Sequence, residues 1–292
     1  MVRRAATACA FGATLLAAAC GVDDPVLDSG PAATKVVVGA ADSVHSELVA
    51  EIYAHALARA GVATEVRQLD PRVSELAAID AGQIQLGSET TGDLLVRLNP
   101  TAAQTKPDEV FTALNQALPQ GISVTDYAAA QERDTVVATT ETAERLGGAD
   151  LEKIGSRCGE LTLGTSRALT DKVVKALQDE YGCRFREVRN YGRADLAAGL
   201  TSGDIQVAIM PSSTTALFDG NLVALADDEY VFAAQNIVPV LRTGALPDAG
   251  IVKLNIVAAE LTTSDLAELS AQVDAGKSAV DAARGWLDSL DL

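Results

Sequence analysis

The feature that most constrains the fold is an alternation of strand and helix patterns that begins at residue 35. Residues 35–40, KVVVGA, form a β-branched run around a glycine, which is typical of a buried strand. Residues 42–61 then place apolar side chains at helical spacing, with Ser43 positioned to cap the start and Gly61 to end the helix. Strand patterns at 64–69 and 83–87 alternate with helix patterns at 72–82, 91–99 and 108–118. This order predicts a parallel sheet covered by helices.

A second round of the same kind follows and leads into a helical tail. Strand patterns at 134–140, 160–164, 185–191, 204–210, 221–225 and 236–242 surround helix patterns at 140–148, 150–156, 168–182 and 193–203. Three more helices are expected at 248–261, 262–273 and 278–290, the second capped by Thr262 or Thr263 and the third by Ser278. No long low-complexity linker separates the two rounds. We therefore predict two α/β lobes joined by strand-like crossings, which suits a hinge.

The N-terminus has the features of a targeting segment. Arg3 and Arg4 precede an apolar run, residues 5–19, that is too short to span a bilayer, so we predict a signal peptide over 1–19. Cys20 directly follows and resembles the lipobox of bacterial lipoproteins, in which the signal is cut before a cysteine that carries a lipid. Ala17 stands three residues before Cys20, where leucine, valine or isoleucine is usual. The alternative is an ordinary cleaved signal that releases a soluble protein.

On the lipoprotein hypothesis, residues 20–34 are a lipidated cysteine and a polar tether, and the body is held at the outer face of the cytoplasmic membrane. Two cysteines remain in that body, Cys158 and Cys183. In an exported protein such a pair predicts a disulfide, with two free buried thiols as the alternative. The formal net charge of −17 opposes nucleic acid and anionic membrane surfaces as partners.

Motifs of enzymatic or metal chemistry are absent from the sequence. It contains no G-x-S-x-G, H-E-x-x-H, P-loop or G-x-G-x-x-G pattern, so we predict no catalytic residues, no cofactor and no metal site. The two histidines, His45 and His55, fall ten residues apart in one predicted helix and do not share a face. His45 lies close to a strand end, where ligand crevices form in open α/β sheets, and is therefore a candidate contact.

Several segments together resemble a known family of binding proteins. They are VVVGAADSVHSELVAEIYAHALARAG, ELAAIDAGQIQLGSETTGDLL, TDYAAA, LAAGLTSGDIQVAIMPSSTTAL and LADDEYVFAAQNIVPVLR. Their order and spacing over residues 35–290 resemble the substrate-binding proteins of glycine betaine, choline and osmoprotectant ABC transporters. The resemblance implies a type II periplasmic-binding-protein fold with two α/β lobes, each a mixed, mostly parallel sheet flanked by helices. Two hinge strands would join lobe 1, residues 35–130 plus 238–292, to lobe 2, residues 131–237.

The ligand chemistry departs from that family. Its members hold a quaternary ammonium in a cage of aromatic rings, because the trimethylated nitrogen has no N–H to donate. Of four tyrosine positions this chain keeps Tyr127, while Thr90, Pro211 and Gln235 stand at the others. Each lost ring removes about 0.5–2 kcal/mol, so three losses weaken binding of a quaternary amine by roughly 10-fold to 10,000-fold. Tyr230 or Phe232 could substitute.

Hydroxyl and amide groups take the place of the rings and suit a neutral polar ligand. The residues expected around the ligand are Asp42, Ser43, His45, Thr90, Thr91, Tyr127, Pro211, Ser212, Ser213, Thr214, Gln235 and Asn236. Arg167 and Lys172 are the nearest matches to the basic residue that binds a ligand carboxylate in the family. The alternative for each hydroxyl or amide is that it caps a helix or satisfies a turn.

The predicted function is that of an extracytoplasmic solute-binding lipoprotein of an ABC importer. It would act as a monomer, bind a small polar solute between its lobes and present it to a membrane permease. The solute need not be a quaternary amine. The alternatives are a sensor or scaffold lipoprotein on the same fold, and a two-lobed hydrolase or transferase that uses His45 or Asp42.

Overall fold

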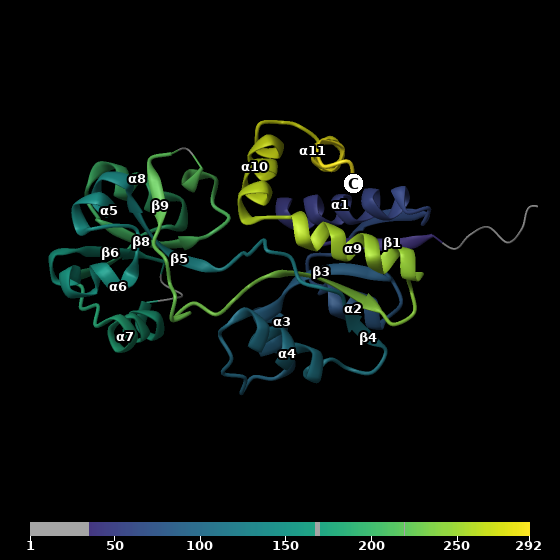
Figure 1. Ribbon diagram of the computed structural model, residues 1–292, viewed down its shortest axis with the longest axis horizontal. Helices are drawn as coiled ribbons and strands as arrows, with labels where there is room; N and C mark the ends of the chain where they lie inside the picture. Colours follow the sequence, from purple (N-terminus) through teal and green to yellow (C-terminus); the bar gives the residue numbers. More distant parts are fainter. Residues whose placement is uncertain (1–34, 167–169, 219) are drawn as a thin grey trace, which may run out of the picture. The chain divides into compact units, whose positions relative to one another are not determined.

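The computed structural model describes residues 35–166, 170–218 and 220–292 (Figure 1). The predicted signal peptide, Cys20 and the tether lie outside these residues. Within them the chain forms two five-stranded sheets, each flanked by helices, and this confirms the predicted two-lobed fold class. No helix in the described part of the chain combines the length and the apolar character that a membrane crossing needs.

The sheet of lobe 1 has the order β2-β1-β3-β10-β4. Its strands are β1 (Val36–Ala40), β2 (Thr64–Gln68), β3 (Leu86–Thr90), β4 (Ile122–Val124) and β10 (Ile237–Arg242). β1 pairs in parallel with β2 and β3, whereas β10 runs antiparallel to β3 and β4. The register sets Ile237 opposite Thr90, so the chain enters this sheet from lobe 2 beside the carboxyl end of β3.

The sheet of lobe 2 repeats this layout in the order β7-β6-β8-β5-β9. Its strands are β5 (Asp134–Thr139), β6 (Thr162–Thr165), β7 (Glu187–Asn190), β8 (Val207–Pro211) and β9 (Leu222–Ala224). β6 is parallel to β7 and β8, and β5 is antiparallel to β8 and β9. In each sheet the reversed strand, β5 or β10, is the one that the chain reaches by crossing from the other lobe.

Among the described residues, lobe 1 has seven helices. They are α1 (Val44–Arg59), α2 (Glu75–Asp80), α3 (Thr91–Leu98), α4 (Pro107–Ala117), α9 (Asp248–Glu260), α10 (Thr263–Asp274) and α11 (Ala279–Ser289). Figure 1 shows α1 and α9 on one face of the sheet and α3 and α4 on the other. The predicted caps are present: Ser43, Thr262 and Ser278 each accept a backbone N–H of the first helical turn.

The helices of lobe 2 are shorter. They are α5 (Thr140–Leu146), α6 (Leu151–Ile154), α7 (Thr170–Tyr181) and α8 (Leu196–Ser202), with 3₁₀ turns at Gly155–Glu160, Arg193–Asp195 and Thr215–Leu217. Side chains such as Val136, Leu163 and Val207 from the strands pack with Leu151 and Leu177 from the helices in a continuous core. Burial of such apolar surface is the main force that stabilises each lobe.

The structure departs from the predictions at the strands expected over 83–87 and 204–210, which begin three residues later, and at TDYAAA (125–130), which the family resemblance implies is a hinge strand. Residues 82–84 close the end of α2 through backbone hydrogen bonds to Ala78 and Ile79, so β3 begins only at Leu86. Two crossing segments join the lobes, the first at 125–133 between β4 and β5 and the second at 225–236 between β9 and β10. Residues 125–130 of the first contain no strand, and the Ala128 N–H donates to the Ile237 carbonyl at 2.7 Å, where the second segment ends. One antiparallel bridge, Gln131 to Asn236, joins the two crossing segments. The short strand β4 was not predicted.

A buried carboxylate fixes the second crossing segment where it leaves lobe 2. Asp227 is 3% exposed and accepts the Tyr181 hydroxyl at 2.7 Å and the backbone N–H groups of Val231 and Phe232 at 3.0 Å each. The guanidinium of Arg133, on the first crossing segment, lies 3.7 Å from the same carboxylate. The end of α7 and both crossing segments therefore all contact the Asp227 carboxylate.

The predicted disulfide between Cys158 and Cys183 is present. Both residues are buried, and their Cα atoms are 5.1 Å apart. The bond fastens the 3₁₀ turn that precedes β6 to the loop that follows α7.

Removal of this disulfide is expected to cost about 3 kcal/mol of unfolding free energy, because it closes a loop of 25 positions in the unfolded chain. The measurement is urea unfolding of the Cys158→Ala/Cys183→Ala variant. Reductant should lower the midpoint of the natural protein and leave that of the variant unchanged. Without reductant, a double variant that unfolds at the same urea concentration as the natural protein would contradict the expectation.

Candidate functional site

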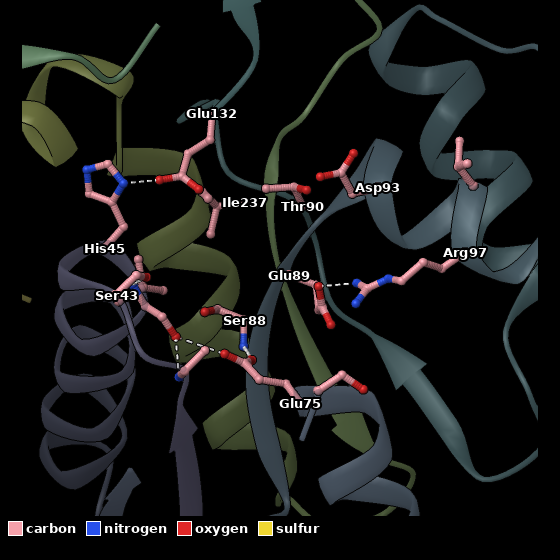
Figure 2. A pocket seen from close by; sticks show the side chains of 15 residues that line it. Ser43, His45, Glu75, Ser88, Glu89, Thr90, Asp93, Arg97, Glu132 and Ile237 are labelled. Carbon is pink, nitrogen blue, oxygen red and sulfur yellow. Dashed lines mark hydrogen bonds and ion pairs between the residues drawn. The ribbon is translucent and has the colours of Figure 1, made fainter. Parts of the chain in front are cut away.

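A cavity of about 550 Å³ opens at the carboxyl ends of β1 and β3 in lobe 1 (Figure 2). This is the edge of an open α/β sheet at which ligands bind. The lining side chains come from the loop after β1, the first two turns of α1, the start of α2, the carboxyl end of β3, α3, the first crossing segment and the first residue of β10. They are Ala41, Ser43, His45, Ser46, Val49, Ser74, Glu75, Ser88, Glu89, Thr90, Asp93, Val96, Arg97, Glu132 and Ile237.

The floor of the cavity is a hydrogen-bonded carboxyl group, that of Glu75. Glu75 is 4% exposed and accepts the Ser46 hydroxyl at 2.9 Å and the Ser88 backbone N–H. A Cβ on Gly87 would collide with this carboxyl group, so the close approach of α2 to β3 requires glycine there. Burial raises the pKa of Glu75 to about 8, more than its hydrogen bonds lower it. The raised pKa favours the protonated, neutral form of Glu75 at neutral pH.

The wall formed by β3 and α3 carries an ion pair. Arg97, in the last turn of α3, donates to the carboxylate of Glu89 at the end of β3. Burial raises the pKa of Glu89, and the Arg97 hydrogen bond and charge oppose that shift. Thr90, the N-cap position of α3, makes no side-chain capping bond and lines the cavity with its hydroxyl.

The first turn of α3 is bonded to the second crossing segment. Gln235 donates through Nε2 to Asp93 Oδ1 at 2.8 Å and accepts the Asp93 backbone N–H at 2.9 Å. Thr91 accepts the Asn236 backbone N–H at 3.1 Å, and Asn236 Nδ2 donates to the Ala128 carbonyl at 2.8 Å. A movement of the second crossing segment would therefore shift Asp93 in the cavity wall through its two hydrogen bonds to Gln235.

The opposite wall comes from α1 and the first crossing segment. His45 Nδ1, in the first turn of α1, pairs with the carboxylate of Glu132, and both side chains are about one quarter to one third exposed. Figure 2 shows this pair across the cavity from Glu89 and Asp93. The Glu132 backbone N–H donates to the Gln235 carbonyl at 3.0 Å, which holds the two crossing segments together at the cavity.

Three of the residues predicted around a ligand line this cavity: Ser43, His45 and Thr90. Thr91 and Asn236 are buried at the crossing, and both polar atoms of the Gln235 side chain are engaged by Asp93. These bonds are of the kind that the alternative, a helix-start or turn role, describes. Asp42 is exposed beside the cavity and does not line it.

The predicted contacts from lobe 2 lie elsewhere. Pro211 ends β8, and the Ser212 hydroxyl donates to the Gln131 carbonyl at 2.9 Å. Ser213 and Thr214 line a second cavity, of about 320 Å³, together with Ser43 and His45. Lys172 is exposed on α7, and Arg167 lies outside the described residues.

The aromatic side chains that could cage a quaternary amine are engaged with other groups. The Tyr127 hydroxyl donates to Asp108 at 2.6 Å, a bond that raises the pKa of Tyr127 to about 12, and its ring packs edge-on against Phe111 at 5.0 Å. The Arg133 guanidinium lies over the Tyr230 ring at 5.2 Å. Phe232 is 6% exposed within the core of lobe 2. Phenylalanine, tyrosine and tryptophan are absent from the described residues that line the main cavity.

Sequence reasoning missed the charged lining: Glu75, Glu89, Asp93, Arg97 and Glu132. One signal was available, because Glu89, Asp93 and Arg97 are four residues apart and follow a predicted strand at its carboxyl end. Glu132 gave a weaker signal as a charged residue inside a short interlobe connection. Glu75 gave none, since its burial depends on the glycine opposite it.

Comparisons with known proteins agree with this architecture. A family model described as the substrate binding domain of an ABC-type glycine betaine transport system matches residues 34–289. A crystal structure of a glycine betaine/carnitine/choline ABC transporter protein is similar at 18% identity and a TM-score of 0.79, over 87% of this chain and 98% of that one. Apo YehZ from Escherichia coli is similar at 18% identity and a TM-score of 0.76, over 88% and 99%.

Lactococcal OpuAC, closed around glycine betaine, is similar at 12% identity and a TM-score of 0.52, over 88% of this chain and 96% of that one. At such identities the solved structures establish the fold, and the family model establishes the family. Domains of this family bind a solute for a transporter outside the cytoplasm and are not enzymes. With nearly all of its described residues inside the match, the chain belongs to the family of substrate-binding domains of ABC-type glycine betaine transport systems.

Proposed function

We propose that this protein is an exported lipoprotein that delivers a small polar solute, other than a quaternary amine, to an ABC permease. Membership of the family supports the transport role. Cys20, directly behind the short apolar run that follows Arg3 and Arg4, supports export and lipid anchoring. The acidic net charge supports a partner other than nucleic acid.

The observation that carries the ligand part of this proposal is the lining of the main cavity. Its polar groups are carboxyls, hydroxyls, one guanidinium and one imidazole, while its described lining has no aromatic carbocycle. A quaternary ammonium gains little in such a site, because its attraction depends on ring faces. A solute with hydrogen-bond donors can pair with the carboxyl oxygens that no protein donor engages.

Binding is proposed to shift the protein between open and closed arrangements of the lobes. The crossing segments contact the cavity through Glu132 on one side and through the Gln235–Asp93 bonds on the other. A solute that contacts these groups and also lobe 2 would favour the closed arrangement, which the permease would recognise. The protein would act as a monomer. A sensor or scaffold role remains the competing function and requires no transported solute.

A thermal-shift screen tests this proposal. Glycine betaine, choline and proline betaine should raise the melting temperature little, whereas at least one hydrogen-bonding polar solute should raise it clearly. The Thr90→Val variant should reduce that shift because it removes a lining hydroxyl, and Thr112→Val, on the exposed face of α4, should not.

A clear shift by glycine betaine that Tyr127→Ala abolishes would overturn the proposed ligand class. The absence of a shift by any solute would favour the sensor or scaffold role.

A further inference from the structure

We propose that the solute of the main cavity is a small organic cation whose charged nitrogen bears hydrogens, an amine or a guanidinium, held by Glu132, Asp93 and Glu89. This inference rests on the proposed function of the same cavity and adds the chemical class of its ligand. Three properties of the cavity support this class: the net charge of its lining, its acceptor atoms without a protein donor, and the free-energy penalty for a ligand that leaves those atoms unpaired.

The lining carries a surplus of negative charge. With Glu75 neutral, the carboxylates of Glu89, Asp93 and Glu132 face the single guanidinium of Arg97. The surplus is two negative charges with His45 neutral and one with His45 protonated. A cavity that closes around a solute excludes water, so this charge must be balanced by the solute itself.

The carboxylates also present acceptor atoms to the cavity. Asp93 uses Oδ1 for Gln235, and among the described residues no hydrogen bond engages its Oδ2. Glu132 Oε1 is buried against the His45 imidazole, with which it forms an ion pair, and among the described residues no hydrogen bond engages Glu132 Oε2. Figure 2 shows Glu132 and Asp93 on facing sides of the cavity, so a ligand with several N–H groups would meet a carboxylate on each side.

The number of hydrogens on the ligand nitrogen decides between two kinds of cation. An ammonium or guanidinium satisfies the carboxylate oxygens with short charge-assisted hydrogen bonds. A trimethylated nitrogen covers the same oxygens with methyl groups and leaves them desolvated and unpaired. A site that hydrogen-bonds a ligand donor binds an analogue without that donor far more weakly, because its own polar groups are left unpaired. An apolar site loses much less affinity when a ligand gains or loses one methylene group.

Two other ligand classes fit the lining less well. A neutral polyol would bond to the carboxylates but leave the surplus charge uncompensated. A bare divalent cation needs three or more ligating groups gathered around one point, and no such group occurs among the described His, Cys, Asp and Glu residues. The carboxylates are instead spread around a cavity whose volume suits an organic molecule.

Calorimetric titration with matched cations tests the inference. The panel comprises ethanolamine, putrescine, agmatine, lysine and arginine, each alongside its fully N-methylated counterpart where one exists, with choline as the counterpart of ethanolamine. Charge stays constant within a pair while the N–H groups are lost. We expect at least one N–H-bearing cation to bind and its methylated counterpart to bind at least 10-fold more weakly.

Two variants and one control locate the interaction. Asp93→Asn and Glu132→Gln should each weaken binding of that cation by about 10-fold to 100-fold, because each removes a charge-assisted hydrogen bond. Glu144→Gln removes the same charge from an exposed position of α5 in lobe 2 and should leave affinity unchanged. Melting curves without solute show that each variant is folded.

Each outcome bears on one hypothesis. Equal or tighter binding of the methylated member, or binding that both cavity variants leave unchanged, overturns the amine inference. Binding of a neutral polyol or a divalent cation together with failure of every amine and guanidinium also overturns it, and the solute-binding function survives. If no solute of any class binds, the proposed function fails as well.

Discussion

Replacing Asp227 with alanine is expected to lower the free energy of unfolding of lobe 2 by about 3–5 kcal/mol, the range found when one partner of a buried ion pair is removed. The Asp227 carboxylate is 3% exposed and accepts the Tyr181 hydroxyl and two backbone N–H groups. Alanine would leave these donors and the Arg133 guanidinium without their acceptor. Since whole domains are stable by about 5–15 kcal/mol, the loss would be a large fraction of the total.

Equilibrium unfolding in urea measures this effect. Asp228→Ala, at the exposed neighbouring position, is the matched control and should change stability by less than about 0.5 kcal/mol. Tyr181→Phe removes one of the donors and should cost about 1 kcal/mol. A loss of less than about 1 kcal/mol for Asp227→Ala would show that the cluster does not hold α7 and the crossing segments together.

Stability is expected to fall as the pH rises from 4.5 to about 8, and Glu75 is the main cause. Burial raises the pKa of Glu75 from 4.5 to about 8, so the folded protein holds a proton there that the unfolded chain has released. One such group lowers the free energy of unfolding by about 1.4 kcal/mol per pH unit within this window. Below pH 4.5 both states are protonated, and the contribution of Glu75 is flat.

The Glu75→Gln variant should remove most of this fall, because an amide has the shape of the neutral acid and can accept the Ser88 N–H through its oxygen while donating through its nitrogen to the Ser46 hydroxyl. At pH 8 it should be more stable than the natural protein by about 2–4 kcal/mol. Burial raises the pKa of Glu51, Glu89 and Asp134 too, so a shallower fall remains. Glu160→Gln is the control, since the Arg157 hydrogen bond lowers the pKa of Glu160 and its loss should not flatten the curve.

Urea unfolding at half-unit pH steps without solute measures both curves. Parallel curves for Glu75→Gln and the natural protein would contradict the assignment of a neutral carboxyl group to the cavity floor.

The main elements of the fold could be predicted from the sequence because their signals are local. The β-branched run that forms β1, the caps Ser43, Thr262 and Ser278, and the helical spacing of α1 depend on residues close together in the chain. β3 was displaced by three residues because its start depends on how α2 ends, and β4 is too short to give a pattern.

The site was harder to predict because its residues are assembled by the topology. Ser43, His45 and Thr90, which were predicted as ligand contacts, line the cavity because they follow strands whose carboxyl ends a parallel sheet places on one edge. Gln235 and Asn236 have the right chemistry for a ligand, but the antiparallel entry of β10 beside Thr90 uses them to hold the crossing. Glu75 becomes a lining group only because Gly87 lets α2 approach β3.

A crystal structure of the protein with the strongest-binding solute from the panels is the most direct test of the central assignment. We expect the solute within the lobe 1 cavity, with its nitrogen in hydrogen-bonding distance of Glu132, Asp93 or Glu89. A solute bound outside this cavity, or enclosed by Tyr127 and other rings with the three carboxylates unengaged, would contradict it.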